Sequence, residues 1–164
     1  MEDNTFFNAA RMGDIPLLQQ LIDQQVDVNR IDMKGFTPLI IASYNGHLEA
    51  TKLLIEANAD VNTQDFGGNT ALMGVCFKGY ADIAELLIAS GADLNRQHGN
   101  GGTALMFATI FGRNQLVKVL LKHDADLHIR DNRGLTAYDL AIQQGNEEAM
   151  DLLQQKLAKG QRPA

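Results

Sequence analysis

The chain has little of several features that would assign a function by themselves. Cys76 is the one cysteine among 164 residues, and a single thiol cannot close an internal disulfide. No stretch approaches the ~18 consecutive apolar residues of a transmembrane helix, and the acidic start has no signal-like apolar run. We therefore expect no membrane span and take the cytoplasm as the default compartment, although a chain with its leader removed would look the same.

Positive charge is scarce as well. The chain has 14 Lys and Arg against 20 Asp and Glu, for a net charge of -6 and a pI of about 5.1. No run of basic residues occurs before the tail KLAKGQRP at 156–163. Because affinity for nucleic acid depends on basic side chains that neutralise phosphates, we expect no nucleic-acid partner.

A period of 33 residues runs through most of the chain. It relates Thr37, Thr70, Thr103 and Thr136, then Gly46, Gly79, Gly112 and Gly145, and then Leu54, Leu87, Leu120 and Leu153. A fixed period of this length indicates stacked structural units. Each unit can bury its apolar face only against its neighbours, so we predict a core that runs as a ribbon along the stack.

One unit, residues 34–66, reads as two short helices and a loop. Thr37 and Pro38 are typical of a helix start, and the Asn45-Gly46 pair is typical of its end. A second helix is predicted from His47 to about Asn58 by its apolar stripe. The segment ADVNTQDFGGNT that follows is rich in Gly, Asp and Asn, which predicts an extended arm and a turn.

The phrase TPLIIASYNGHLEATKLLIEANADVN, with GADLN from Gly91, resembles the ankyrin repeat. The resemblance implies an all-α solenoid of stacked helix-turn-helix units with projecting β-turn loops, in one domain over residues 1–164. The units are expected at 1–33 (N-cap), 34–66, 67–99, 100–132 and 133–164 (C-cap). The family's usual His after Thr-Pro-Leu is replaced, which puts its hydrogen bonds between neighbouring turns in doubt; the replacements are Ile40, Met73, Met106 and Asp139.

The two ends of the stack and one inner position carry unusual residues. Gln154 stands where earlier units have Ile or Leu, and Asn8 stands at an inner position that is Ile41 or Leu140 elsewhere, so both ends read as polar caps. Gly74 occupies that same inner position in the third unit and Phe107 in the fourth. Since close-packed interiors do not tolerate gaps, we expect the Phe107 ring to sit over Gly74.

No group of residues predicts catalysis or a bound metal. The histidines are scattered over different repeat positions, and Cys76 takes a small inner position that Ser43 and Thr109 fill elsewhere. The pair Gly67-Gly68 lacks the Lys and the strand-to-helix context of a phosphate loop. We therefore predict no catalytic residue, no metal and no cofactor, and hence a protein that is not an enzyme.

The resemblance implies that a partner protein binds the concave side, which the turn tips and the first helices form. Five of the ten aromatic residues fall there on positions that the core does not require, and apolar groups of this kind mark interaction sites. Lys34, Lys78 and Arg133 flank them and favour a partner with some acid at its rim. The predicted partner-binding residues are Met33, Lys34, Phe36, Tyr44, Asn45, Phe66, Asn69, Phe77, Lys78, Asn100, Ile110, Phe111, Arg133 and Leu135.

Three other interpretations stay open at this stage. Some of the five rings could fold back over neighbouring turns, and the same face of a structural protein could instead join two copies of the chain. An enzyme would require a tightly bound metal or a deep pocket lined by titrating groups. We expect the protein alone to be a monomer that acts as an adaptor, regulator or inhibitor of its partner. The sequence does not identify that partner.

Overall fold

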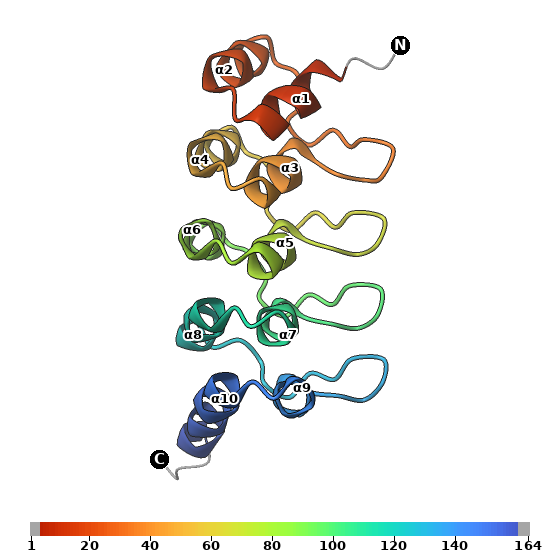
Figure 1. Cartoon of the computed structure of the whole chain (residues 1–164). Coiled ribbons are helices and arrows are strands. Elements are labelled where there is room, and N and C mark those ends of the chain that lie inside the picture. The colour runs from red at the N-terminus through yellow and green to blue at the C-terminus, as the bar shows by residue number, and fades with distance from the viewer. Residues whose placement is uncertain (1–3, 161–164) are drawn as a thin grey trace.

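The computed structural model describes residues 4–160, which form helix pairs stacked in chain order with a loop projecting from one side between pairs (Figure 1). No strand occurs within these described residues, so the all-α prediction is confirmed. The helices are α1 (Thr5–Met12), α2 (Ile15–Asp23), α3 (Pro38–Tyr44), α4 (Leu48–Glu56), α5 (Ala71–Lys78), α6 (Ala81–Ala89), α7 (Ala104–Ile110), α8 (Asn114–Lys122), α9 (Ala137–Gln144) and α10 (Glu147–Gly160).

Each first helix from α3 onward begins where its threonine predicts. The Thr37 hydroxyl accepts a hydrogen bond from the Ile40 amide at 3.1 Å, and Thr70, Thr103 and Thr136 repeat this cap. The cap occupies a backbone donor that the first turn leaves free. After α3 the chain reverses at Gly46, whose φ of 79° lies in the left-handed region that glycine adopts without strain. The sequence therefore sets both ends of these short helices locally.

The core is a continuous apolar spine shared by all the helix pairs. The second helix of each pair carries a leucine at the same buried position of the repeat. These residues are Leu21, Leu54, Leu87, Leu120 and Leu153. First helices pack on first helices and second helices on second helices, so every inner pair is covered on both sides. The polar side chains Asn8 and Gln154 are exposed at the two ends, although Ile142 on α9 is also 52% exposed.

Hydrogen bonds also join the loops of successive units. Asn62 donates from Nδ2 to the Gly91 carbonyl at 3.0 Å and accepts at Oδ1 from the Asp93 amide at 2.7 Å. At the tips, the Phe66 amide donates to the Lys34 carbonyl at 3.1 Å, and Gly99 and Asn132 make the equivalent bonds. Cross-unit hydrogen bonds are therefore present without the family's usual His, because the backbone and amide side chains make them.

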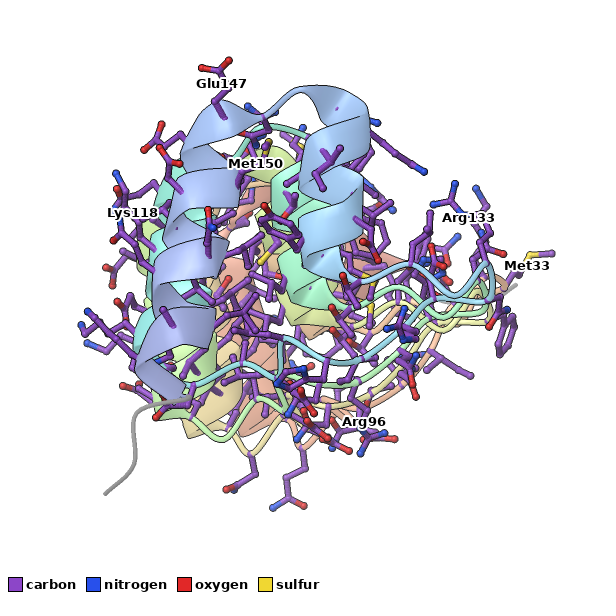
Figure 2. The ribbon with its side chains drawn as sticks, turned by 90° about the horizontal axis from the view of Figure 1, so that it is seen from below. Met33, Arg96, Lys118, Arg133, Glu147 and Met150 are labelled. Atoms are coloured by element: carbon purple, nitrogen blue, oxygen red, sulfur yellow. The ribbon has the colours of Figure 1, made fainter. Side chains whose placement is uncertain are left out.

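Viewed along the stack, the loops lie over one another (Figure 2). Met33 and Arg133 come from different loops but both lie on the side of the loop tips. Lys118 lies on the opposite side of the molecule, by the second helices, where its Nζ is 2.8 Å from Glu148 Oε1. The stack thus has a side formed by loops and first helices, and an outer side formed by second helices.

His98 replaces the aspartate that shapes the other turns. Asp32, Asp65 and Asp131 each accept two backbone N–H groups at Oδ1, two and four residues further on. His98 instead accepts the Asn100 amide at Nδ1, at 3.1 Å. Burial lowers the pKa of His98, while the charge of Asp65 acts in the opposite direction. The turn therefore holds a neutral imidazole, because protonated Nδ1 cannot accept a hydrogen bond.

The bridge made by Asn62 gives a first prediction. Asn62→Ala removes two hydrogen bonds between neighbouring units and should lower the free energy of unfolding by about 1–2 kcal/mol. His128→Ala is the matched control, since His128 occupies the same position in the last loop and its side chain bridges no described unit. Urea unfolding measures both; equal midpoints for the two variants would contradict the assignment.

The neutral imidazole of His98 gives a second prediction, in the acidic range. Its pKa is lower in the folded chain, so the unfolded chain takes up the proton first as the pH falls below about 7. The wild type should therefore lose stability between about pH 7 and 5 relative to His98→Asn, which keeps an acceptor but does not titrate. Urea unfolding at both pH values measures this, and a pH-independent difference between the two proteins would show that His98 is not coupled to folding.

Candidate functional site

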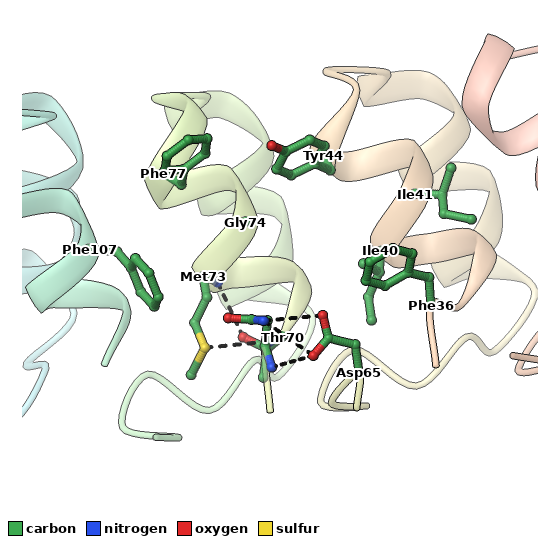
Figure 3. Close-up of a pocket in the computed structure, with 11 residues that line it drawn as sticks. Phe36, Ile40, Ile41, Tyr44, Asp65, Thr70, Met73, Gly74, Phe77 and Phe107 are labelled. Atoms are coloured by element: carbon green, nitrogen blue, oxygen red, sulfur yellow. Dashed lines mark hydrogen bonds between the residues drawn. The ribbon is translucent and has the colours of Figure 1, made fainter. Parts of the chain in front are cut away.

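The loops and first helices enclose a hollow between α3, α5 and the loop that joins their units (Figure 3). Its volume is about 430 Å³, and its lining is mostly aromatic and aliphatic. We call it the Gly74 hollow, because Gly74 on α5 borders it where other units carry Ile41, Phe107 or Leu140. The hollow therefore lies beside the one inner position of the stack that has no side chain.

The predicted packing of Phe107 on Gly74 is wrong. A Cβ on Gly74 would lie 3.2 Å from Tyr44 Cδ2, and no atom of Phe107 comes within 4 Å of it. The Phe107 ring instead lies 4.9 Å from the ring of His98, in the loop that precedes α7, and 6.4 Å from the Phe111 ring, measured between centroids. Tyr44 therefore covers Gly74 from the preceding unit, and Phe107 forms a wall of the hollow.

Four rings form a row across three units, which we call the aromatic row: Tyr44, Phe77, Phe111 and Phe107. Tyr44 and Phe77 are stacked at 6.3 Å, and Phe77 meets Phe111 edge-on at 4.6 Å. Both distances lie in the range in which aromatic pairs attract one another. Tyr44 is 41% exposed and Phe111 44%, so the row is ordered by ring contacts while part of its surface stays open to solvent.

The structure brings some of the predicted binding residues together at the hollow and places others along the same side. Phe36, Tyr44, Asn69 and Phe77 all line the Gly74 hollow. Met33 and Lys34 line a second depression near α1, and Asn100, Ile110 and Arg133 line a third between α7 and α9. Side chains from several units therefore border one long face.

The remaining predicted binding residues do not line any of these three hollows. The Phe66 ring lies over Gly35 of the preceding loop, which is the folding back over a neighbouring turn that the alternative interpretation describes. The residue is nevertheless 73% exposed. Asn45 donates from its side chain to the Ile41 carbonyl at 2.8 Å and is exposed. Lys78 and Leu135 are half-buried, and Phe111 belongs to the aromatic row.

The charges along this face are arranged less simply than the sequence indicated. Arg133 is paired with Asp131, at 3.0 Å between Nη2 and Oδ2. The Lys78 ammonium lies 5.1 Å from the centroid of the Tyr44 ring, in the geometry of a cation–π contact. Asp65 stands at the edge of the Gly74 hollow. Of the three predicted flanking cations, therefore, Arg133 is already matched by an acid of its own turn.

Sequence reasoning missed Phe107, Asp65 and Met73, which also line the Gly74 hollow. The signal was present at Gly74, the one glycine in a series of otherwise larger side chains at the inner position. The sequence alone predicts that Phe107 of the next unit fills this gap. The sequence does not reveal that this inner position faces the loops, whereas the structure shows Gly74 beside the loop residues Asp65 and Asn69.

The described residues offer few side chains that could bind a metal or act in catalysis. Within residues 4–160 no cluster of three or more His, Cys, Asp or Glu side chains could hold a metal ion. Burial raises the pKa of the Cys76 thiol, which is opposite to what a nucleophilic cysteine needs. None of the described helices has the length and hydropathy to span a membrane. What the face offers is a series of hollows, of which the Gly74 hollow has a mostly apolar lining.

Comparisons with known proteins agree with this architecture. A family model described as ankyrin repeats (3 copies) matches residues 6–98, and one described as ankyrin repeats (many copies) matches residues 87–141. The ankyrin repeat domain-containing protein 29 of Danio rerio is 46% identical over 50 residues, which are 30% of this chain and 17% of that protein. The aligned segment thus spans less than a fifth of that curated relative.

Ankyrin repeats generally mediate protein–protein interactions, and proteins built from them are typically non-catalytic binding modules. The first family model alone covers more than half of the chain, and the helix pairs, capping threonines and projecting loops agree with it. The chain belongs to the ankyrin-repeat family.

Proposed function

We propose that this protein is a non-catalytic module that holds a partner protein on its concave face, with the aromatic row at the centre of the contact. The observation that carries the proposal is the aromatic row itself. Rings on three successive units contact one another while two of them stay more than 40% exposed, Tyr44 at 41% and Phe111 at 44%. A solvent-facing row of this kind needs a reason beyond folding.

The core does not supply that reason. The buried spine is made of aliphatic side chains and Phe6 and Phe7, while Tyr44, Phe77 and Phe111 remain partly open to solvent. Aromatic side chains are typical anchors of interface centres, because they bury a large area and lose little conformational freedom. Fixed rings also lower the ordering cost of binding. The row therefore fits an interface that is already formed before the partner arrives.

The same surface supports an adaptor, a regulator or an inhibitor equally well, since each of these roles needs a specific partner and no chemistry. No step of catalysis is proposed. A homodimer through the same face would use the same rings, and the solution behaviour of the pure protein distinguishes it from a complex with another protein.

A triple variant with Tyr44→Ala, Phe77→Ala and Phe111→Ala removes three rings of the aromatic row and tests the proposal. Copurification from the native host with wild type as bait should recover a specific partner that the triple variant loses, with at least a hundredfold drop in affinity once that partner is measured in pure form. The variant should keep the helical circular-dichroism spectrum of the wild type, because Tyr44, Phe77 and Phe111 do not belong to the buried core.

The control carries Ile15→Ala and Ile142→Ala, which remove exposed apolar side chains that do not line the Gly74 hollow. It should retain the partner. Loss of the partner from both variants, or retention by both, would exclude the aromatic row as the binding centre. A concentration-dependent dimer in sedimentation equilibrium that the triple variant abolishes would favour self-association instead.

A further inference from the structure

We propose that the Gly74 hollow receives an arginine side chain of the partner protein. This inference rests on the proposed function and adds the chemistry of the group that enters the site. Two features of the hollow carry it, a wall of aromatic rings and a carboxylate without a cationic partner, and both face the same space (Figure 3).

The aromatic rings are the first feature. Phe36, Tyr44, Phe77 and Phe107 border the hollow and come from three different units. The faces of aromatic rings attract cations, and a guanidinium group can also stack flat on them. Lys78 already lies over Tyr44 at 5.1 Å, so one ring of the wall attracts a cation in the free protein.

The carboxylate of Asp65 is the second feature. Its Oδ1 accepts the backbone amides of Gly67 and Asn69 at 2.8 Å each, and the Asn69 side-chain amide lies 3.2 Å from both Oδ1 and Oδ2, so Oδ2 has only this shared donor. No Lys or Arg forms an ion pair with Asp65 within residues 4–160. Oδ2 thus keeps acceptor capacity toward a donor that enters the hollow.

The equivalent positions in other units show that this arrangement is specific to the middle of the stack. Asp131 is neutralised by Arg133 from its own turn. Asp32 lies in a depression that it shares with Arg11 and Lys34. In the third unit, 67–99, the position is His98, which is neutral at pH 7 because burial lowers its pKa, so it brings no positive charge to Asp65.

Arginine matches the two features better than the other side chains of its size. Its planar fork makes charge-assisted hydrogen bonds to a carboxylate while its face stacks on a ring. Its three-carbon stem can lie along apolar surface such as Ile40 and Met73. A leucine would leave Asp65 facing apolar atoms, and a lysine has no flat face to stack. The acidic chain, with a net charge of -6, also favours the approach of a basic segment.

Short peptides titrated into the full chain test the inference. The probe is acetyl-Gly-Gly-Arg-Gly-Gly-amide, and its controls carry citrulline, the neutral isostere of arginine, or leucine at the centre. In ¹H–¹⁵N correlation spectra the arginine peptide should shift the amides of Gly74, Phe77 and Asn69, with a Kd of order 1 mM as expected for one anchored side chain. The citrulline and leucine peptides should bind at least fivefold more weakly.

A matched pair of variants locates the charge. Asp65→Asn keeps an oxygen that accepts the turn amides and should weaken the arginine peptide at least fivefold. Asp32→Asn makes the same change one unit earlier, outside the Gly74 hollow, and should leave its affinity within twofold. The citrulline comparison needs no variant, so the test stands even where Asp65→Asn folds poorly.

Three results would overturn the inference: equal binding of the citrulline or leucine peptide, no binding at the hollow by 20 mM peptide, or an unchanged affinity in Asp65→Asn. The first would make the hollow a plain apolar pocket. If the partner is lost by the triple ring variant but retained by Asp65→Asn, the proposed function stands and only the proposal of an arginine is excluded.

Discussion

The contact between one helix pair and the next is the interaction on which the rest of this structure depends. A single pair has too little core to fold alone, and its apolar stripes are covered only when a neighbour packs on each side. The buried leucine repeated from Leu21 to Leu153 follows from this constraint, since the same contact recurs at every interface. Stability then resides along the spine, so the loops and the side of the first helices that faces them are not needed for folding and can contact another protein.

Polar bridges keep this available face in shape. The amide of Asn62 and its equivalents join neighbouring loops, and backbone bonds join the loop tips. Arg113 adds a further bridge, donating from Nε to the Phe77 carbonyl at 3.0 Å at the end of α5. The Phe66 bond and the Arg113 bond hold the loop and helix segments next to the Gly74 hollow, so binding of the proposed partner should cost little ordering entropy.

The sequence predicted most of the fold because the information is local and repeated. Thr37 and its equivalents fix where helices begin, Gly46 and its equivalents fix where they end, and the period fixes the order of units. It predicted the side of the molecule on which Phe36, Tyr44 and Phe77 lie for the same reason, since the register assigns each position a direction.

The sequence did not predict the hollow, because that depends on distances between units. Gly74 was expected to be covered by Phe107, yet the ring that covers it comes from Tyr44 in the preceding unit. Whether a large side chain leans toward its own loop or a neighbour is decided by contacts such as that of Phe107 with His98. The pairing of Arg133 with Asp131 depends instead on the conformation of their shared turn, which folds the two side chains together.

The central claim is that stability comes from contacts between adjacent units, and native-state hydrogen exchange of the wild type tests it most directly. Interior pairs are covered on both sides and the terminal pairs on one, so amides of α5 and α6 should exchange most slowly and those of α1, α2 and α10 fastest. A graded fall in protection from the middle of the stack to both ends is the predicted result. Uniform protection across all helices would contradict the account, because it would mean that the chain unfolds as one indivisible globule.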